Sequence, residues 1–257
     1  MRFFIGTVLI LVLVTPARTL GGGFNKVLQF PREVSLSNFV LLRPDFTQIQ
    51  EELSICSWVK IYRTDHVRYW FSYNIAGSEG DNQIIFGTAA NGQHFLADAM
   101  PGSTEPYATN IWHHTCFTWS SASQLEELYL NGVKIAEELT PDNSKVPTGG
   151  TLVLGQEQDS PGGNFDINQS FGGEIYRLEI LKRKISAGEV ADMYHAGMCD
   201  YPAPSTDVVL DWADFLEAEK SGEVKEVSAG CSRWDVLENF VGQEITDSVI
   251  AFLKRNF

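Results

Sequence analysis

The sequence predicts an all-β protein, folded as a flattened antiparallel sandwich or jelly roll. From about residue 24 to residue 185, short apolar segments are separated by turn residues. Within these segments apolar and polar residues alternate, which is the period of a half-buried strand. One Asn-Gly pair also joins two such segments. Many short strands with regular turns are typical of β sandwiches and jelly rolls.

Individual elements can be assigned along the chain. Residues 67–73 and 174–181 alternate as strands do, and residues 128–135 predict a hairpin that turns at Asn131-Gly132. Asn-Gly is preferred in type I′ turns because both turn residues need positive φ. One helix is expected after Ser186, which forms a capping box with Glu189, and Gly197 can close it. We expect Met193 and Tyr194 of this helix to face the core.

The first residues predict a secretory signal peptide, residues 1–19. A short basic start precedes an apolar run that ends at Val14, and small residues follow at cleavage positions. The run is too short to span a bilayer comfortably, and no other window is apolar enough. We therefore expect an exported, extracellular protein without a transmembrane segment.

Composition excludes some partners. The chain has 257 residues and a formal net charge of −14, and loss of the leader would take the charge to −16 because two arginines and no acid depart. Such an acidic protein is unsuited to nucleic acid and to anionic membranes unless a cation bridges the two. Plain solubility explains most of this charge equally well.

The chain has four cysteines, and in an exported protein they suggest two disulfides. Three connectivities exist, and the pairs Cys56–Cys116 and Cys199–Cys231 are favoured. The first pair lies in two strong strand segments, and the second brackets a C-terminal excursion. Loops of this size contribute about 4 kcal/mol each in the chain-entropy model. The absence of Cys-x-x-Cys argues against zinc or redox chemistry.

The end of the chain has a different pattern. From Trp234 onward, apolar residues recur every three to four positions with acids between them, which predicts an amphipathic helix. Residues 232–257 are therefore expected to form an extension beyond a domain that covers residues 24–231. The extension would pack back on the domain, with contacts to a subunit or partner as the alternative.

The most informative stretch, residues 154–169, gathers side-chain oxygens around a Gly-Gly turn. Its carboxylates and amides are Glu157, Gln158, Asp159, Asp166 and Gln169. Calcium prefers six to eight oxygen ligands on a backbone that can wrap around it. Taken alone, the stretch suggests a calcium loop, although an acidic loop with glycines is more often a solvated surface connection.

Several segments, in the right order, resemble the pentraxin family. His-Thr-Cys-Phe-Thr-Trp-Ser-Ser at residues 114–121 matches the family signature His-x-Cys-x-Ser/Thr-Trp-x-Ser/Thr. The loop at 154–169 resembles the family's calcium loop, Asp81-Asn82 its upstream ligand pair, and residues 30–33 its opening strand. The resemblance covers residues 24–199 well and continues more loosely to Cys231, in the manner of invertebrate C-reactive-protein-like and serum-amyloid-P-like chains.

The resemblance implies a concanavalin-like jelly roll with one helix on one face, two calcium ions on the other, and a cyclic homo-oligomer. It also implies the Cys56–Cys116 bridge. The first calcium would be held by Asp81, Asn82, Glu157, Asp159 and the Gln158 carbonyl. The second would be held by Glu157, Asp159, Asp166 and Gln169.

The chain departs from the family pattern at three places. Asp166 stands where many members carry Glu, so its reach is one methylene shorter. Alignment with the vertebrate phosphocholine pocket places Gly87 where that pocket has an aromatic residue, and Phe86 is expected to point to the other sheet face. The same alignment places Leu96 where the pocket has a small hydroxyl residue. These positions put phosphocholine preference in doubt but leave phosphate binding intact. The sequon at Asn168 overlaps the Gln169 ligand, so we expect it to be unglycosylated.

The resulting functional hypothesis is a calcium-dependent lectin or opsonin of innate immunity. It would bind phosphocholine, phosphoethanolamine or acidic glycans on microbial or damaged cells. One alternative is a laminin-G-like adhesion module, which shares the sandwich, the hairpin and calcium binding on one face. A glycan hydrolase is disfavoured because Gly162 occupies the place of the third acid in a Glu-x-Asp-x-x-Glu pattern. We therefore expect that the protein is not an enzyme.

Overall fold

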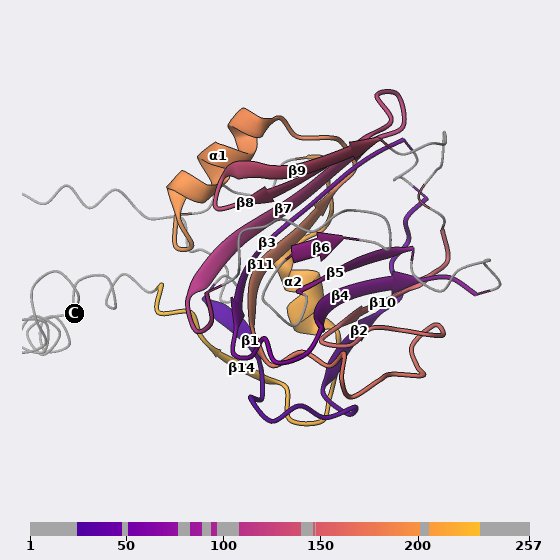
Figure 1. Ribbon diagram of the computed structural model, residues 1–257, viewed down its shortest axis with the longest axis vertical. Coiled ribbons are helices and arrows are strands. Elements are labelled where there is room, and N and C mark those ends of the chain that lie inside the picture. The colour runs from indigo at the N-terminus through magenta and orange to yellow at the C-terminus, as the bar shows by residue number, and fades with distance from the viewer. Residues whose placement is uncertain are drawn as a thin grey trace, which may run out of the picture.

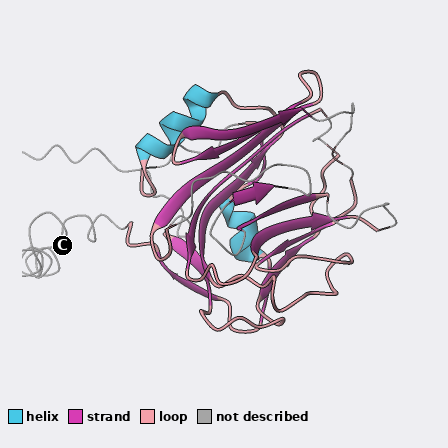
Figure 2. Ribbon diagram, in the orientation of Figure 1, coloured by secondary structure: helices cyan, strands magenta, loops and turns pink. Residues whose placement is uncertain are grey.

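The computed structural model describes residues 25–47, 51–76, 83–88, 94–96, 108–139, 146, 148–200 and 206–231. The expected leader, the expected C-terminal extension and the pair Asp81-Asn82 lie outside these residues. The described chain forms two β sheets that pack face to face, and helix occupies little of it (Figures 1 and 2). The predicted jelly-roll sandwich is therefore confirmed. Among the helices described here, none combines the length and apolarity that crossing a bilayer requires.

The larger sheet lies to the upper left of the smaller one in Figure 1, and its strand pairs are antiparallel. In spatial order its strands are β14 (Lys225–Ser228), β1 (Lys26–Phe30), β11 (Gly173–Leu181), β3 (Glu52–Ile61), β7 (Trp112–Ser120), β8 (Leu125–Leu130) and β9 (Val133–Leu139), with β12 (Val208–Leu210) paired to β11.

The smaller sheet faces it and is also antiparallel. Its strands in spatial order are β13 (Glu219–Ser221), β2 (Phe39–Leu42), β10 (Thr151–Leu154), β4 (Arg68–Asn74), β5 (Ile84–Thr88) and β6 (His94–Leu96). Alternate residues divide between its two faces. Val40 and Leu152 belong to the core between the sheets, and Val153 lies on the opposite, outer face.

The predicted hairpin is confirmed. β8 and β9 are joined at Asn131 and Gly132, whose φ angles are 50° and 79°. The Asn131 side chain also accepts a hydrogen bond from the backbone N–H of His114 at 3.0 Å. The turn therefore links β7, which carries the signature segment, to the edge of the larger sheet.

The predicted helix is confirmed as α1 (Ala187–Ala196). The Ser186 hydroxyl accepts from the Glu189 N–H, and the Glu189 carboxylate accepts from the Ser186 N–H at 2.9 Å, so two N-terminal amides are satisfied. Met193 is buried, and the Tyr194 ring stacks on Trp58 of β3 at 5.9 Å. α1 therefore covers the outer face of the larger sheet (Figure 1).

The chain after α1 contributes more structure than the sequence indicated. A second helix, α2 (Trp212–Glu217), begins with a capping box between Asp211 and Asp214. Trp212 and Phe215 are fully buried, and the Trp212 indole N–H donates to the Lys26 carbonyl at 2.7 Å. Because β13 and β14 then extend the two sheets, residues 206–231 are part of the domain.

The structure contains both favoured disulfides. Cys56 and Cys116 are opposite one another on β3 and β7, with Cα atoms 4.1 Å apart. Cys199 and Cys231 have Cα atoms 5.0 Å apart and enclose α2 together with β12, β13 and β14. The first bridge therefore joins two central strands, and the second fixes the C-terminal part of the domain.

Candidate functional site

The oxygen-rich loop connects β10 to β11 and lies over the outer face of the smaller sheet. The Phe165 ring contacts Phe39 of β2 with centroids 5.2 Å apart. A β carbon on Gly162 would lie 3.3 Å from a methyl group of Leu41, also on β2. The loop closes on itself through two backbone hydrogen bonds between Ser160 and Gly163, of 3.3 and 2.8 Å. It is therefore a packed element rather than a solvated connection.

Two buried glutamine side chains anchor the loop. Gln156 donates to the carbonyls of Ser35 and Asn38 at 2.9 and 3.0 Å and accepts from the Ser170 hydroxyl at 2.7 Å. Both glutamine side chains are fully buried. Since buried amides are costly unless their hydrogen bonds are made, this network fixes where the loop starts and ends.

Gln158 has a different role from the one expected for its side chain. Its Nε2 donates to the carbonyls of Ser72 and Thr151 at 2.9 and 3.1 Å, and its Oε1 accepts from the Gly162 N–H at 2.7 Å. The side-chain oxygen therefore accepts a structural hydrogen bond that closes the loop. The Gln158 carbonyl accepts from Asn74 Nδ2 at 2.8 Å, and a carbonyl oxygen has a second lone pair to offer.

The expected carboxylate ligands differ in environment. Glu157 is 1% exposed, whereas Asp159 and Asp166 are exposed. Asp166 Oδ1 accepts from the Asn168 N–H at 2.9 Å and from Asn168 Nδ2 at 3.1 Å. Gln169 is half-buried, and its N–H donates to the Asp166 carbonyl at 3.0 Å. Asp166 and Gln169 thus belong to one hydrogen-bonded turn.

Comparisons with known proteins agree with this fold. The model of the Pentaxin family matches residues 26–226. The chain belongs to the pentraxin family. This membership decides between the pentraxin and the laminin-G-like interpretations, and at the family level pentraxins are binding proteins without enzymatic activity.

Several pentraxins are similar to the chain. Human neuronal pentraxin-1 is 32% identical over 185 residues, which cover 70% of this chain and 39% of that protein. The chain therefore spans about two fifths of the length of the neuronal pentraxins that it matches. Female protein of Nothocricetulus migratorius is 30% identical over 203 residues, 77% of this chain and 81% of that one.

A solved structure supports the same fold. The native heptameric SAP-like pentraxin from Limulus polyphemus superposes with a TM-score of 0.63 at 22% identity, covering 82% of this chain and 98% of that chain. At this identity the likeness concerns the fold alone.

The donor set of this pentraxin loop fits calcium in chemical type. Carboxylates and a backbone carbonyl are hard oxygen ligands, and sulfur and imidazole are absent from the expected set. In the described part of the chain, however, no three His, Cys, Asp or Glu residues are grouped as a metal would require. Asp81 and Asn82, which would complete the first site, lie outside that part.

The expected ligand-pocket residues lie on β5 and β6. Phe86 is 7% exposed and packs between Phe71 and Phe117, with centroids 5.0 and 5.7 Å away. It faces the core, as expected, and cannot contact a ligand on the outer face. Leu96 is opposite Phe86 in register, and the structure describes its backbone only.

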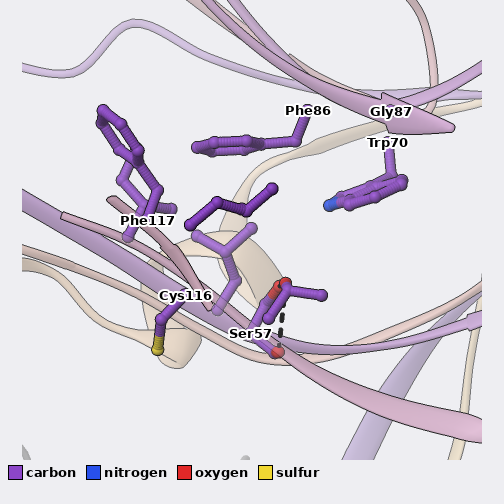
Figure 3. Close-up of a pocket in the computed structure, with 10 residues that line it drawn as sticks. Ser57, Trp70, Phe86, Gly87, Cys116 and Phe117 are labelled. Carbon is purple, nitrogen blue, oxygen red and sulfur yellow. Dashed lines mark hydrogen bonds between the residues drawn. The ribbon is translucent and has the colours of Figure 1, made fainter. Parts of the chain in front are cut away.

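Figure 3 shows the small cavity beneath this part of the sheet. Trp70, Phe86 and Gly87 of the smaller sheet face Ser57 and Phe117 of the larger one. The cavity has room for about one water molecule, beside a 3.2 Å hydrogen bond between the hydroxyls of Ser57 and Thr115. It is a gap in the core and too small to be a ligand pocket.

Gly87 has a neighbour that the sequence did not reveal. Tyr69 is opposite Gly87 in register, and a β carbon on Gly87 would lie 2.7 Å from Cδ1 of the Tyr69 ring. The space of a side chain at position 87 is therefore already filled by an aromatic ring from β4. The absence of an aromatic residue at 87 does not leave a hole.

Several residues that hold the loop have no signal in the sequence. Gln156 lies within residues 154–169, but only the structure shows its long-range partners. Ser72, Asn74 and Arg68 are on β4, roughly 85 to 100 residues from their loop partners, and no local pattern marks them.

Proposed function

We propose that this protein is a secreted, calcium-dependent recognition protein that binds phosphorylated or acidic groups. It acts as a lectin or opsonin toward microbial or damaged-cell surfaces, and it assembles as a cyclic homo-oligomer. The single observation that supports this proposal best is a loop of oxygen donors, anchored by buried hydrogen bonds on the outer face of a pentraxin sandwich.

Two calcium ions would be shared between two segments. Asp81, Asn82, Glu157, Asp159 and the Gln158 carbonyl form the first donor set, and Glu157, Asp159, Asp166 and Gln169 form the second. Glu157 is common to both sets and would bridge the two ions, and its side chain is buried where the loop leaves β10. The exposed Asp159 and Asp166 are at the solvent side of the same loop.

Anion binding needs bound cations such as these calcium ions, because the protein itself is acidic. The formal charge of −14 repels phosphates and carboxylates over the molecule as a whole. Bound calcium would supply positive charge and unfilled coordination positions for one anionic oxygen. The loop's position on an outer face leaves that side accessible to ligands attached to a surface.

Assembly would multiply weak binding. The Limulus relative is a heptamer, which supports a ring for this chain without fixing its size. Several sites that face one surface raise apparent affinity by orders of magnitude over a single site. This arrangement suits repeated groups on a cell surface better than a free small molecule.

The ligand preference follows from the surroundings of Gly87. Since Tyr69 fills the side-chain space there and Phe86 faces the core, the residues that would pack against a choline group are altered. We therefore expect phosphate or carboxylate to dominate recognition, with phosphoethanolamine and acidic glycans bound at least as well as phosphocholine.

Calorimetry on the mature, full-length protein tests the proposal. Calcium should bind at micromolar to millimolar concentrations, and retention on phosphoethanolamine beads should require it. Glu157→Gln should weaken calcium binding at least about tenfold, because one charged bridging ligand is lost. The matched control is Glu137→Gln, an exposed carboxylate on β9 that pairs with Lys134. Indifference of the wild type to millimolar calcium would refute the proposal.

A further inference from the structure

A buried arginine lies beneath the end of the loop. The Arg68 side chain is 2% exposed, and its Nη2 forms an ion pair with Asp65 Oδ1 at 2.7 Å. Its Nη1 donates to the carbonyl of Ser170 at 2.9 Å and to that of Ile167 at 3.4 Å. A charged guanidinium is rarely buried unless it is paired and hydrogen-bonded. Here its hydrogen bonds join β4 to the loop.

The neighbouring residue extends the same contact. The backbone N–H of Tyr69 donates to the Gln169 carbonyl at 3.0 Å. Three loop carbonyls, at Ile167, Gln169 and Ser170, are therefore held by two consecutive residues of β4. The loop contributes its own bonds, since the Asp166 carbonyl accepts from the Gln169 N–H at 3.0 Å and from the Ser170 hydroxyl at 3.2 Å.

The consequence concerns Asp166 and Gln169, the expected ligands of the second ion. Their backbone is fixed by bonds to β4 and within the turn, and none of these bonds involves a metal. A loop rich in carboxylates normally resists folding in the absence of cations, because its charges repel one another. Hydrogen bonds from Arg68 to the carbonyls of Ile167 and Ser170 hold this segment through its backbone, independently of its carboxylates.

We propose that Arg68 is a positioning residue that keeps residues 166–170 ordered when calcium is absent, so that Asp166 and Gln169 are placed before the ion arrives. The role toward calcium rests on the proposed function. The ordering itself does not, because the contacts that support it are hydrogen bonds between protein atoms.

Amide hydrogen exchange on the mature protein in EDTA tests this directly. Wild type should show protected amides at 168–170 in EDTA, changing less than about threefold when calcium is added. Arg68→Gln removes the positive charge and the forked N–H donors of the guanidinium. The amide exchange rate of residues 168–170 in EDTA should then rise at least about tenfold. Arg68→Lys keeps the charge but presents a single ammonium, so it should give an intermediate increase.

The readouts separate positioning from general stability. Peptides from β3 should keep wild-type exchange in both variants, and calcium should restore protection of 168–170 in Arg68→Gln. Arg183→Gln is the matched control, because it removes a cation with two ion pairs, to Glu189 and Asp207, near α1. If Arg68→Gln does not fold, the exchange of residues 168–170 in Arg68→Lys is compared with that of wild type instead.

Two outcomes would overturn the inference. One is a wild-type segment that loses protection about tenfold on transfer to EDTA. The other is exchange in both Arg68 variants equal to that of wild type. Failure of the proposed function would look different, since calcium would then change no peptide while the Arg68 effect in EDTA persisted.

Discussion

At the scale of single residues, steric fit at Gly87 has a consequence for the ligand face. A β carbon there would be 2.7 Å from Cδ1 of Tyr69 and 2.9 Å from the Arg68 carbonyl oxygen. The Tyr69 ring can be removed by mutation, whereas the Arg68 carbonyl belongs to the backbone and stays in any variant. The aromatic ring beside position 87 therefore comes from Tyr69 of β4.

Gly87→Ala should lower the free energy of unfolding by about 1–3 kcal/mol, as overpacking does. The loss should be smaller in a Tyr69→Ala background, because only the backbone clash remains. Urea unfolding of the four proteins of this double-mutant cycle measures the coupling between the two positions. Additive losses would contradict the packing described here.

A buried carboxylate on the larger sheet makes the stability of the protein depend on pH. Glu179 of β11 is 3% exposed, and its burial raises its pKa from 4.5 to about 7, although Arg177 acts in the opposite direction. The folded state therefore binds this proton more tightly than the unfolded chain does. Its contribution to stability is complete below pH 4.5 and is lost as the pH rises to about 7.

Glu179→Gln should therefore stabilise the protein at pH 8, by up to about 3 kcal/mol, and leave stability at pH 4.5 little changed. Urea unfolding in EDTA at the two pH values measures the difference, with the exposed Glu219→Gln as control. A variant with the same pH dependence as wild type would show that Glu179 titrates normally.

At the scale of elements, local signals explain which segments form. The Ser186 capping box starts α1, and the Glu189 carboxylate that completes it also pairs with Arg183 at 2.6 Å. The Arg183 hydrogen bond, together with that from the Ser186 N–H, lowers the Glu189 pKa to about 2. The helix is thus fixed at its first turn to the segment that leaves β11.

Ser186→Ala should cost about 1 kcal/mol, because the Glu189 N–H loses its acceptor. Thermal unfolding measures this loss against Ser123→Ala, whose hydroxyl makes only a 3.5 Å contact with the Ser120 carbonyl. Equal melting temperatures for the two variants would show that the cap contributes nothing.

At the scale of the whole molecule, the C-terminal segment and the sandwich form one unit. Trp212 and Phe215 are fully buried in the core, and β13 and β14 each add a strand to a sheet. The Cys199–Cys231 bridge closes this segment onto the domain. The core that it joins is the same core that supports the oxygen-rich loop between β10 and β11.

Replacing Cys199 and Cys231 by serine should therefore lower the midpoint of a single cooperative transition, with a loss of up to about 4 kcal/mol from loop entropy. Calorimetry with calcium held constant measures this. Two resolved transitions would mean that residues 206–231 unfold separately from the sandwich.

Sequence alone determined the elements with strong local chemistry. The Asn131-Gly132 turn, the Ser186 cap and the paired cysteines each depend on near neighbours or on a small set of alternatives, so they could be predicted. α2 also has a capping box, at Asp211 and Asp214, but it is only six residues long and gave no periodic pattern. Family-specific spacing identified the loop and its oxygen donors.

Only the tertiary structure decided how that loop is held. The Gln158 side chain forms hydrogen bonds with Ser72, Thr151 and Gly162, which its position in the sequence does not indicate. Tyr69 fills the space beside Gly87, and Arg68 reaches carbonyls about 100 residues away. These contacts depend on strand register and on the path of the loop across the sheet. Residue types near each other along the chain do not encode such distant contacts.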